Sequence, residues 1–342
     1  MAAPCRPDPP VVGKVTHQSI ELYWDEPPLE GTNGEVKHNN STDRVRYCVQ
    51  EDDSSRSLHP KGFGTVYTGY ARNNIFQGLE AQCKYRYRLR ASNSNGNSEW
   101  SPAVDVSTTR KPITGDDLHK AVNHQDKNAV ILLLDENKSI IDLPDRYGLS
   151  PLMSAAQKGY YEVCEILIAN NADVNRKNAN GKTSFMLACF MGHLKIVRLL
   201  LKNGAVASET DNGGSTALHW AVDGGHIDVV RYLLENGAKV TQRDTVSGWT
   251  PIIRAAASGS NQRVVRVLID HGASVNDKDP EGKTALMVGV INGSEEAIQV
   301  LLEHKADISY KNEYGKTALD FAQTFDRRRI VALFEKYREE SA

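Results

Sequence analysis

Glycine recurs along the second part of this sequence at an almost constant interval. The intervals are 33, 33, 34, 34 and 33 residues, and they separate Gly148, Gly181, Gly214, Gly248, Gly282 and Gly315. A fixed period of this size is typical of a solenoid, in which each unit buries its apolar faces only against its neighbours. The period therefore predicts a stacked array of short repeats rather than a domain with a single central core.

Each repeat carries the signals of two short helices. A hydroxyl residue stands two positions after each periodic glycine and is expected to cap the first helix, as Ser150 and Thr216 illustrate. Pro151 and Pro251 occupy the first helical position, where no amide partner is lost. A second glycine separates this helix from an apolar one in most repeats, at Gly159, Gly192, Gly225, Gly259 and Gly293. The pattern predicts helix–turn–helix units joined by hairpins.

Two stretches, "GSTALHWAVDGGHIDVVRYLLENGA" and "GKTSFMLACFMGHLKIVRLLLKNGA", resemble ankyrin repeats. On this resemblance we expect six repeats and a partial seventh, with starts near Gly115, Tyr147, Asn180, Gly213, Ser247, Glu281 and Tyr314. The first repeat is expected to lack the threonine cap, and the family's threonine-to-histidine bond is expected only at His219. Lys305 stands where a helix-ending glycine adopts a left-handed conformation, which costs a non-glycine residue about 1 kcal/mol.

Residues 11 to 109 alternate with the period of β-strands instead. In "KYRYRLRAS", Tyr85, Tyr87 and Leu89 are predicted to enter a core while the intervening arginines face solvent. Turn residues, among them Gly31 and Asn33-Gly34, separate such runs and indicate an all-β sandwich. Trp24 before "DEPP", together with "YRYRLRASNSNGNSEWSPAVDVSTT", resembles a fibronectin type III domain. The resemblance implies that Trp24 is the core indole and Tyr85 the tyrosine corner.

The segment "GFGTVYTG" is similar to part of a protein kinase's glycine-rich loop. His59 and Lys61 replace the first two glycines that such a loop needs, and no kinase-type lysine, catalytic-loop or metal-binding motif follows. We therefore predict a β-strand here, with Val66 on the core side. Trp100, which follows the arginine-bearing strand, is predicted to stack on Arg86, Arg88 or Arg90 as part of the sandwich surface.

Composition narrows the classes of function. The formal net charge of −2 gives no attraction to nucleic acid, and the longest apolar run, 129 to 134, is too short to cross a bilayer. The five cysteines form no CxxC or Cys/His cluster, so no metal or other cofactor is expected. No constellation of nucleophile, base and orienting group supports an enzyme or a small-molecule substrate. Because no signal peptide precedes the sandwich, we expect the cytosol or nucleus.

The ankyrin resemblance implies protein binding through hairpin tips and the inner helix face. Exposed apolar side chains there favour a binding patch, although they could also shield neighbouring repeats. Basic residues before the hairpin tips, Lys177, Arg243, Lys278 and Lys311, could attract an acidic segment of a partner or form a solvated charge row. The candidate binding residues are Tyr147, Lys182, Phe190, Met191, Trp249, Lys283, Ile291, Tyr314 and Lys316.

The sequence thus predicts a multidomain protein with a fibronectin type III sandwich at 8–110 and an all-α ankyrin solenoid at 114–342. The predicted function is a non-enzymatic adaptor between proteins. This domain order also resembles a family of germ-cell-associated adaptors, which implies a place in nucleus and cytoplasm, extending to the ciliary base, and a link to Jun-dependent transcription and apoptosis. The alternative is a structural scaffold or spacer in a cytoskeletal or ciliary assembly.

Overall fold

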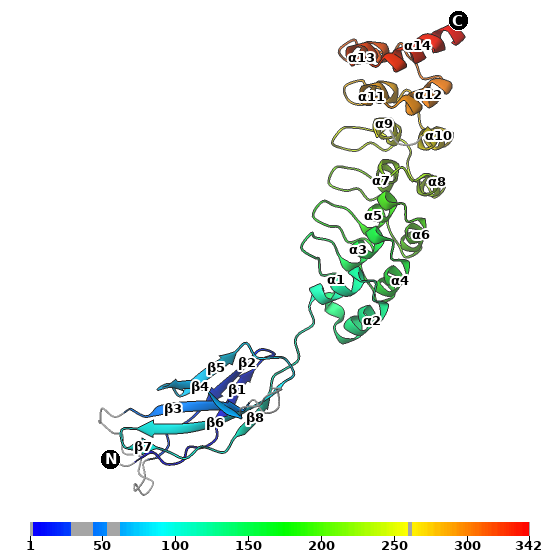
Figure 1. The fold of residues 1–342 in the computed structure, drawn as a ribbon. Helices are drawn as coiled ribbons and strands as arrows, with labels where there is room; N and C mark the ends of the chain where they lie inside the picture. The colour runs from blue at the N-terminus through cyan, green and yellow to red at the C-terminus, as the bar shows by residue number, and fades with distance from the viewer. Residues whose placement is uncertain (1–2, 29–43, 53–61, 259–261, 342) are drawn as a thin grey trace. The chain divides into compact units, whose positions relative to one another are not determined.

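The computed structural model describes residues 3–28, 44–52, 62–258 and 262–341. The chain divides into two compact units, Met1–Pro112 and Ile113–Ala342. The first unit is a β-sandwich and the second is a helical array (Figure 1), which confirms the predicted fold class. Several positions used in the sequence analysis, Gly31, Asn33, Gly34, His59, Lys61 and Gly259, lie outside the described residues.

The sandwich contains two antiparallel sheets. One has the strand order β1 (Val11–Val15), β2 (Ser19–Tyr23), β5 (Asn73–Gln77). The other has the order β4 (Phe63–Gly69), β3 (Arg46–Asp52), β6 (Lys84–Asn93), β7 (Gly96–Asn97), with β8 (Val104–Ser107) also paired to β6.

The core of the sandwich follows the predicted alternation. Trp24 is 4% exposed, and Tyr85, Tyr87 and Leu89 are buried, so the inward face of β6 is confirmed. The hydroxyl of Tyr85 accepts a hydrogen bond of 2.7 Å from the Glu80 amide, which is the bond that a tyrosine corner makes. The two aromatic side chains that carried the resemblance therefore occupy the positions it implied.

Strand β4 corrects one prediction. Val66 is 44% exposed, and Tyr67 packs against the sandwich core instead. The register explains this difference, because Val49 pairs with Tyr67 whereas the next residue, Gln50, pairs with Thr65. Val66 is thus the extra residue of a β-bulge, and a bulge moves the following side chains to the other face of the strand.

Trp100 lies over the outward face of β6, as predicted. Its ring centroid is 4.5 Å from the Arg88 guanidinium carbon and 4.6 Å from that of Arg90. Arg86 does not join this stack and pairs with Asp105 at 3.4 Å. The segment around the indole is also tied to β6, since the hydroxyl of Ser101 accepts from the Leu89 amide at 2.9 Å. These contacts give Trp100 a structural role.

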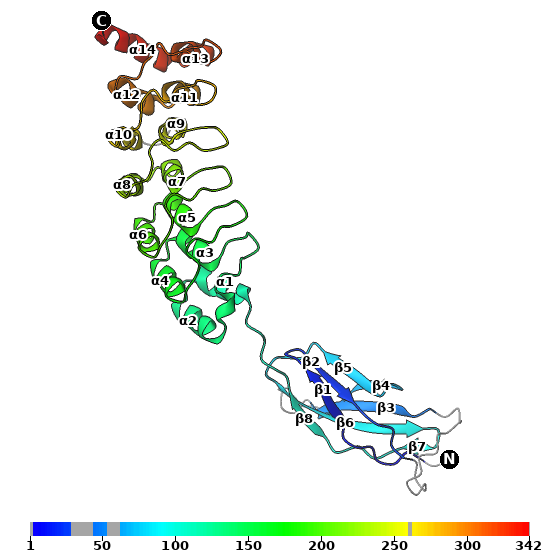
Figure 2. The ribbon, with the colours of Figure 1, turned by 180° about the vertical axis from the view of Figure 1, so that it is seen from behind.

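The second unit consists of short helices in two rows (Figure 1, Figure 2). The odd-numbered helices, called inner helices here, lie on the side from which the hairpins project. They are α1 (Gly115–Asn123), α3 (Pro151–Lys158), α5 (Ser184–Met191), α7 (Ala217–Asp223), α9 (Pro251–Ala257), α11 (Ala285–Asn292) and α13 (Ala318–Thr324). The outer helices are α2 (Lys127–Glu136), α4 (Tyr161–Ala169), α6 (Leu194–Lys202), α8 (Ile227–Glu235), α10 (Gln262–Asp270), α12 (Glu295–Glu303) and α14 (Arg328–Ser341). A short 3-10 helix, η1 (Lys138–Ile140), follows α2.

The caps confirm the periodic pattern. Each periodic glycine has a positive φ, from 65° at Gly248 to 76° at Gly148, so the hairpin turns there favour glycine. The hydroxyl residue two positions later is the N-cap of each inner helix from α3 to α13. The side chain of Thr183, for example, accepts a hydrogen bond from the Met186 amide.

The two ends of the array differ from their predictions. Thr114 caps α1, because its amide and hydroxyl both donate to Asp117, at 3.0 and 2.8 Å; the expectation of a missing threonine cap is wrong. The last repeat was expected to be partial, yet it contains both α13 and the long α14. Asp326, with φ 49°, occupies the left-handed turn between these helices that glycine fills in most other repeats.

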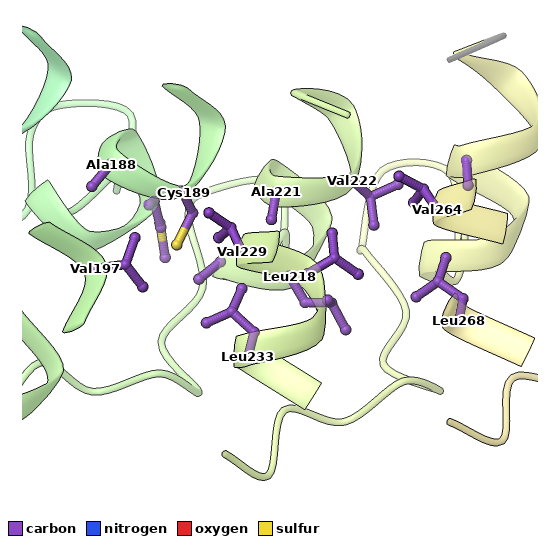
Figure 3. Close-up of a cluster of buried hydrophobic side chains, with 14 of the residues drawn as sticks. Ala188, Cys189, Val197, Leu218, Ala221, Val222, Val229, Leu233, Val264 and Leu268 are labelled. Atoms are coloured by element: carbon purple, nitrogen blue, oxygen red, sulfur yellow. The ribbon is translucent and has the colours of Figure 1, made fainter. Parts of the chain in front are cut away.

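Small buried residues bring the two rows of helices together. Ala188 and Cys189 of α5 and Ala221 of α7 are fully buried against the valines and leucines of the outer helices, as Figure 3 shows. This core runs through the array from Leu118 to Phe334 without interruption. Burial raises the pKa of the Cys164 thiol to about 12, which makes it an inert core residue.

Hydrogen bonds also connect successive hairpins. The Asn175 side chain donates to the Gly204 carbonyl at 2.9 Å and accepts from the Val206 amide at 3.0 Å. The Asn212 amide donates to the Asn180 carbonyl at 3.0 Å. The hairpins therefore form a continuous row along which binding side chains can be placed.

Candidate protein-binding surface

Two apolar side chains stand at the end of inner helix α5. Phe190 is 38% exposed and Met191 is 41% exposed, immediately before Gly192, the left-handed C-cap. The Phe190 ring packs edge-on against Trp220 of α7, with 5.6 Å between ring centroids. The sequence predicted that both side chains are exposed, and the structure confirms this.

Trp220 is a central residue of this surface, although it was not among the residues predicted from the sequence. Its Nε1 donates to Asp211 Oδ2 at 3.1 Å, and the Lys182 ammonium lies 3.9 Å from its ring centroid. Trp220 comes four residues after the cap Thr216, and residues at this spacing lie on one face of a helix. Most other repeats carry a smaller side chain four residues after the cap, so the size of Trp220 at this position is the sequence signal that distinguishes it.

An arginine of α9 continues the surface into the next repeat. The Arg254 guanidinium lies 3.5 Å from Asp223 and 3.3 Å from Asp244, and it donates to the Ser215 hydroxyl at 3.0 Å. Burial raises the pKa of Asp223 to about 6, an effect that the Arg254 charge only partly offsets. None of these residues was predicted from the sequence. The name inner surface is used below for Lys182, Phe190, Met191, Asp211, Trp220, Asp223 and Arg254.

The hairpin tips carry exposed apolar groups as well. Tyr147 is 69% exposed and Tyr314 is 73% exposed, as expected for side chains just before the turn glycines. Val246, at the tip of the hairpin before α9, is 81% exposed. The Arg146 guanidinium carbon lies 4.7 Å from the Tyr147 ring centroid. These tips are available to a partner.

Two predicted binding residues serve the array itself. Trp249 is half-buried against the array core, and its Nε1 approaches Asp279 Oδ2 of the next hairpin at 3.4 Å. Ile291 is half-buried, and its carbonyl accepts a hydrogen bond of 3.0 Å from Arg327. The partial burial of Trp249 and Ile291 favours the alternative interpretation, in which such side chains shield neighbouring repeats.

Most of the basic residues near the hairpins have partners inside the array. Lys177 pairs with Glu209 at 2.6 Å, Arg243 donates to the Lys278 carbonyl at 2.6 Å, and the Lys278 ammonium lies 4.0 Å from the Tyr310 ring centroid. Lys283 pairs with Glu281 at 2.9 Å, and that bond raises the lysine's pKa. Lys316 and Lys311 are exposed. The predicted basic row thus mainly links one repeat to the next.

Comparison with known proteins places these repeats in a family. A family model for ankyrin repeats, described as three copies, matches residues 105–178, 170–244 and 241–312. The mouse fibronectin type 3 and ankyrin repeat domains 1 protein is 50% identical over 287 residues, which cover 84% of this chain and 81% of the relative. The chain belongs to the fibronectin type 3 and ankyrin repeat domains family. Its human member is 50% identical over 290 residues, with the same coverage of both chains.

The array of this family member is also similar to a solved structure. The crystal structure of the ankyrin repeat domain of Bcl-3, described as a unique member of the IkappaB protein family, matches with a TM-score of 0.55 and 29% identity. The match covers 64% of this chain and 97% of the Bcl-3 chain. An ankyrin array is a protein-interaction scaffold, so the helical unit of this family member is a protein-binding array.

The described residues contain neither a metal-binding cluster nor a membrane-spanning helix. Within them, no group of three or more His, Cys, Asp or Glu side chains could hold a metal ion. Across the same part of the chain, no helix has both the length and the apolar character needed to span a membrane.

Proposed function

We propose that this protein is an adaptor that binds a partner protein through the inner surface of repeats three to five. The observation that carries the proposal is the exposure of Phe190 and Met191 beside Trp220. Aromatic and methionine side chains are enriched in the cores of protein interfaces, and clustered aromatics often supply most of the binding energy. The exposed tips at Tyr147 and Tyr314 are proposed to add contacts at the edge of the same interface.

The structure favours Phe190 and Met191 over the half-buried Trp249 as test positions. In the double variant Phe190→Ser, Met191→Ser, the lost apolar area should weaken partner binding while the core of α5 stays intact. A matched control is Ile131→Ser, Leu132→Ser, since these side chains of outer helix α2 are 40% and 62% exposed. Circular dichroism melts must first show that both variants are folded.

The measurement is quantitative affinity capture from germ-cell lysate with the full chain. Partners that bind the wild type and the α2 control but not the α5 variant would support the adaptor. Equal capture by all three proteins would overturn the assignment of the inner surface. If no partner is captured by any of them, the spacer in a cytoskeletal or ciliary assembly becomes the better explanation.

The cellular role is proposed from the family resemblance alone. We carry over an adaptor of nucleus and cytoplasm, extending to the ciliary base, that affects Jun-dependent transcription and apoptosis in germ cells. The remaining basic residues at the C-terminal hairpin, Lys311 and Lys316, are proposed as the place where an acidic segment could bind. A tagged chain expressed in germ cells, with and without a Jun-dependent reporter, tests both localisation and transcriptional effect.

A further inference from the structure

The inner surface combines an apolar patch with an incompletely neutralised set of charges. Its carboxylates, with the adjoining Asp244, number three: Asp211, Asp223 and Asp244. Its cations number two, Lys182 and Arg254, which leaves one excess negative charge. The imbalance is local: Lys182 and Asp211 both contact Trp220, Arg254 pairs with Asp223 and Asp244, and the charges of Asp211 and Asp244 both act on Asp223.

Of these three carboxylates, Asp223 is the one with room for a further partner. Asp211 is satisfied, since its Oδ1 accepts from the amides of Gly213 and Ser215 and its Oδ2 from Trp220. The Asp244 side chain is fully buried, pairs with Arg254 and accepts from the Ser247 amide. Asp223 has a side chain 26% exposed, and its ion pair with Arg254 is long, at 3.5 Å.

Asp223 lies close to the apolar patch. It stands three residues after Trp220 on α7, a spacing that puts both side chains on one helix face, with Cβ atoms about 5–6 Å apart. Gly224, the next residue, packs directly on the Phe190 carbonyl oxygen. Phe190 and Asp223 are therefore close enough for one ligand segment to contact both.

We propose that the inner surface binds a protein segment that carries a large apolar side chain and, within about three residues of it, a lysine or arginine. The apolar side chain packs on Phe190 and Met191, and the cation pairs with Asp223 on the side away from Arg254. An extended segment advances about 3.3 Å per residue, so three residues span roughly 10 Å from the apolar patch at the end of α5 to Asp223 at the end of the neighbouring α7. The inference rests on the proposed function and adds the chemistry of the partner.

Charge complementarity decides the sign of the charge on the partner segment. An acidic segment would bring a carboxylate beside Asp223 and leave the excess negative charge of the surface uncompensated. The basic residues that could have attracted such a segment here, Lys177 and Arg243, are engaged between hairpins. A cation on the partner instead pairs with Asp223, a carboxylate that burial has made costly to ionise. The flanking apolar groups exclude water from that ion pair.

The test uses a random twelve-residue peptide library displayed on phage, selected against the immobilised full chain. Four proteins are compared: wild type, Asp223→Asn, Phe190→Ser with Met191→Ser, and Asp270→Asn as a control on the outer helix α10. Peptides selected by the wild type and by the α10 control should be enriched in an apolar residue close to a lysine or arginine. The Asp223→Asn protein should lose the preference for basic residues and keep the preference for apolar ones.

A selected peptide is then synthesised with its cation intact and with lysine replaced by glutamine. Removal of either charged partner should weaken binding about tenfold, and removal of both should cost little more than either change alone. That coupling distinguishes a direct ion pair from a general effect of charge. It is measured by isothermal titration at constant ionic strength.

The contrary outcomes separate the two proposals. If Phe190→Ser with Met191→Ser abolishes binding while Asp223→Asn neither changes selection nor shows coupling, the charge inference fails and the adaptor surface stands. If all four proteins select the same peptides, both fail. Enrichment of acidic peptides, or no enrichment above an unrelated immobilised protein, overturns the basic-segment inference.

Discussion

Nε2 of His219 donates a hydrogen bond to the carbonyl oxygen of Trp249, 3.3 Å away at the base of the next hairpin. Nδ1 of the same ring accepts from the amide and hydroxyl of Thr216, at 3.1 and 2.9 Å. Both nitrogens are thus used by the neutral ring, which connects an N-cap to the neighbouring repeat. Burial, assisted by the nearby Arg254 charge, lowers the pKa of His219 to about 4.

The first prediction concerns His219→Met, a side chain that other repeats carry at this position. The variant loses both bonds, and we expect about 1–3 kcal/mol less stability at pH 7. A histidine whose folded pKa is depressed contributes stability above its unfolded pKa, and this contribution is lost as pH falls through the folded value. The difference between wild type and variant should therefore shrink from pH 6.5 to pH 4 in urea unfolding.

Asp223 acts in the opposite direction in the same pH window. Its folded pKa of about 6 is raised, so its contribution is present at low pH and is lost as pH rises toward 6. In an Asp223→Asn background, stability should consequently fall more steeply as pH decreases, because the effect of His219 is no longer opposed. A difference between His219→Met and wild type that stays constant from pH 7 to pH 4 would contradict this account.

The second prediction concerns the contact between Gly224 and Phe190. A Cβ atom at Gly224 would lie 2.2 Å from the Phe190 carbonyl oxygen, a backbone atom that cannot move aside cheaply. Gly224→Ala should cost about 1–3 kcal/mol of unfolding free energy. Gly213→Ala is the control, because its Cβ would meet atoms no nearer than 3.4 Å. Similar urea midpoints for both variants would rule out the clash.

The third prediction concerns Lys305, which ends the sixth repeat with φ 63°. Gly204, Gly237 and Gly272 occupy the corresponding positions with similar positive φ. Lys305→Gly should stabilise the array by about 1 kcal/mol because glycine adopts this conformation without strain. Lys305→Ala removes the side chain but retains the Cβ atom, so an equal gain in that control would point to charge rather than backbone conformation.

The fourth prediction concerns the pH dependence of binding to a selected basic peptide. Burial, together with the Asp244 and Asp211 charges, raises the pKa of Asp223 to about 6 against the opposing effect of Arg254. Affinity should rise as pH increases from 5 to 7.5, because the cation of the peptide pairs with the ionised carboxylate. The Asp223→Asn protein should show a flat profile in isothermal titration, and a rise of equal size in that variant would assign the dependence to another group.

The fifth prediction concerns Trp100→Ala in the sandwich. Loss of the stack on Arg88 and Arg90 should lower stability by about 1–2 kcal/mol, since each such contact contributes about 0.5–1 kcal/mol. Tyr70→Ala, at a side chain that is 58% exposed, is the matched control. An unchanged melting temperature combined with loss of a captured partner would show that Trp100 is a binding residue instead.

The sequence was sufficient for the fold because its signals are local. The cap at Thr183 and the left-handed turn at Gly181 depend on a few consecutive residues, and their spacing repeats along the chain. Val66 was misplaced because a β-bulge depends on the register with β3, a strand that is distant in sequence. Thr114 was missed because α1 begins before the motif that defines the other repeats.

The binding surface was less predictable because its contacts cross from one repeat to the next. Position alone indicated that Phe190 and Met191 are exposed. It did not indicate that Trp249 donates a hydrogen bond to Asp279, or that Arg254 forms ion pairs with carboxylates of two neighbouring elements. Trp249 and Asp279, like Arg254 and Asp223, are about 30 residues apart in the chain, and only alignment of equivalent positions in successive repeats brings such pairs together.

The bonds between hairpins described above, such as those of Asn175 and Asn212, reach only the adjacent repeat. Insertion of one whole unit consequently requires new contacts at only two junctions, and loss of a unit requires them at only one. Recombination within a gene for such an array can lengthen or shorten it in steps of about 33 residues. The number of binding positions can therefore change over evolution without redesign of the units that remain.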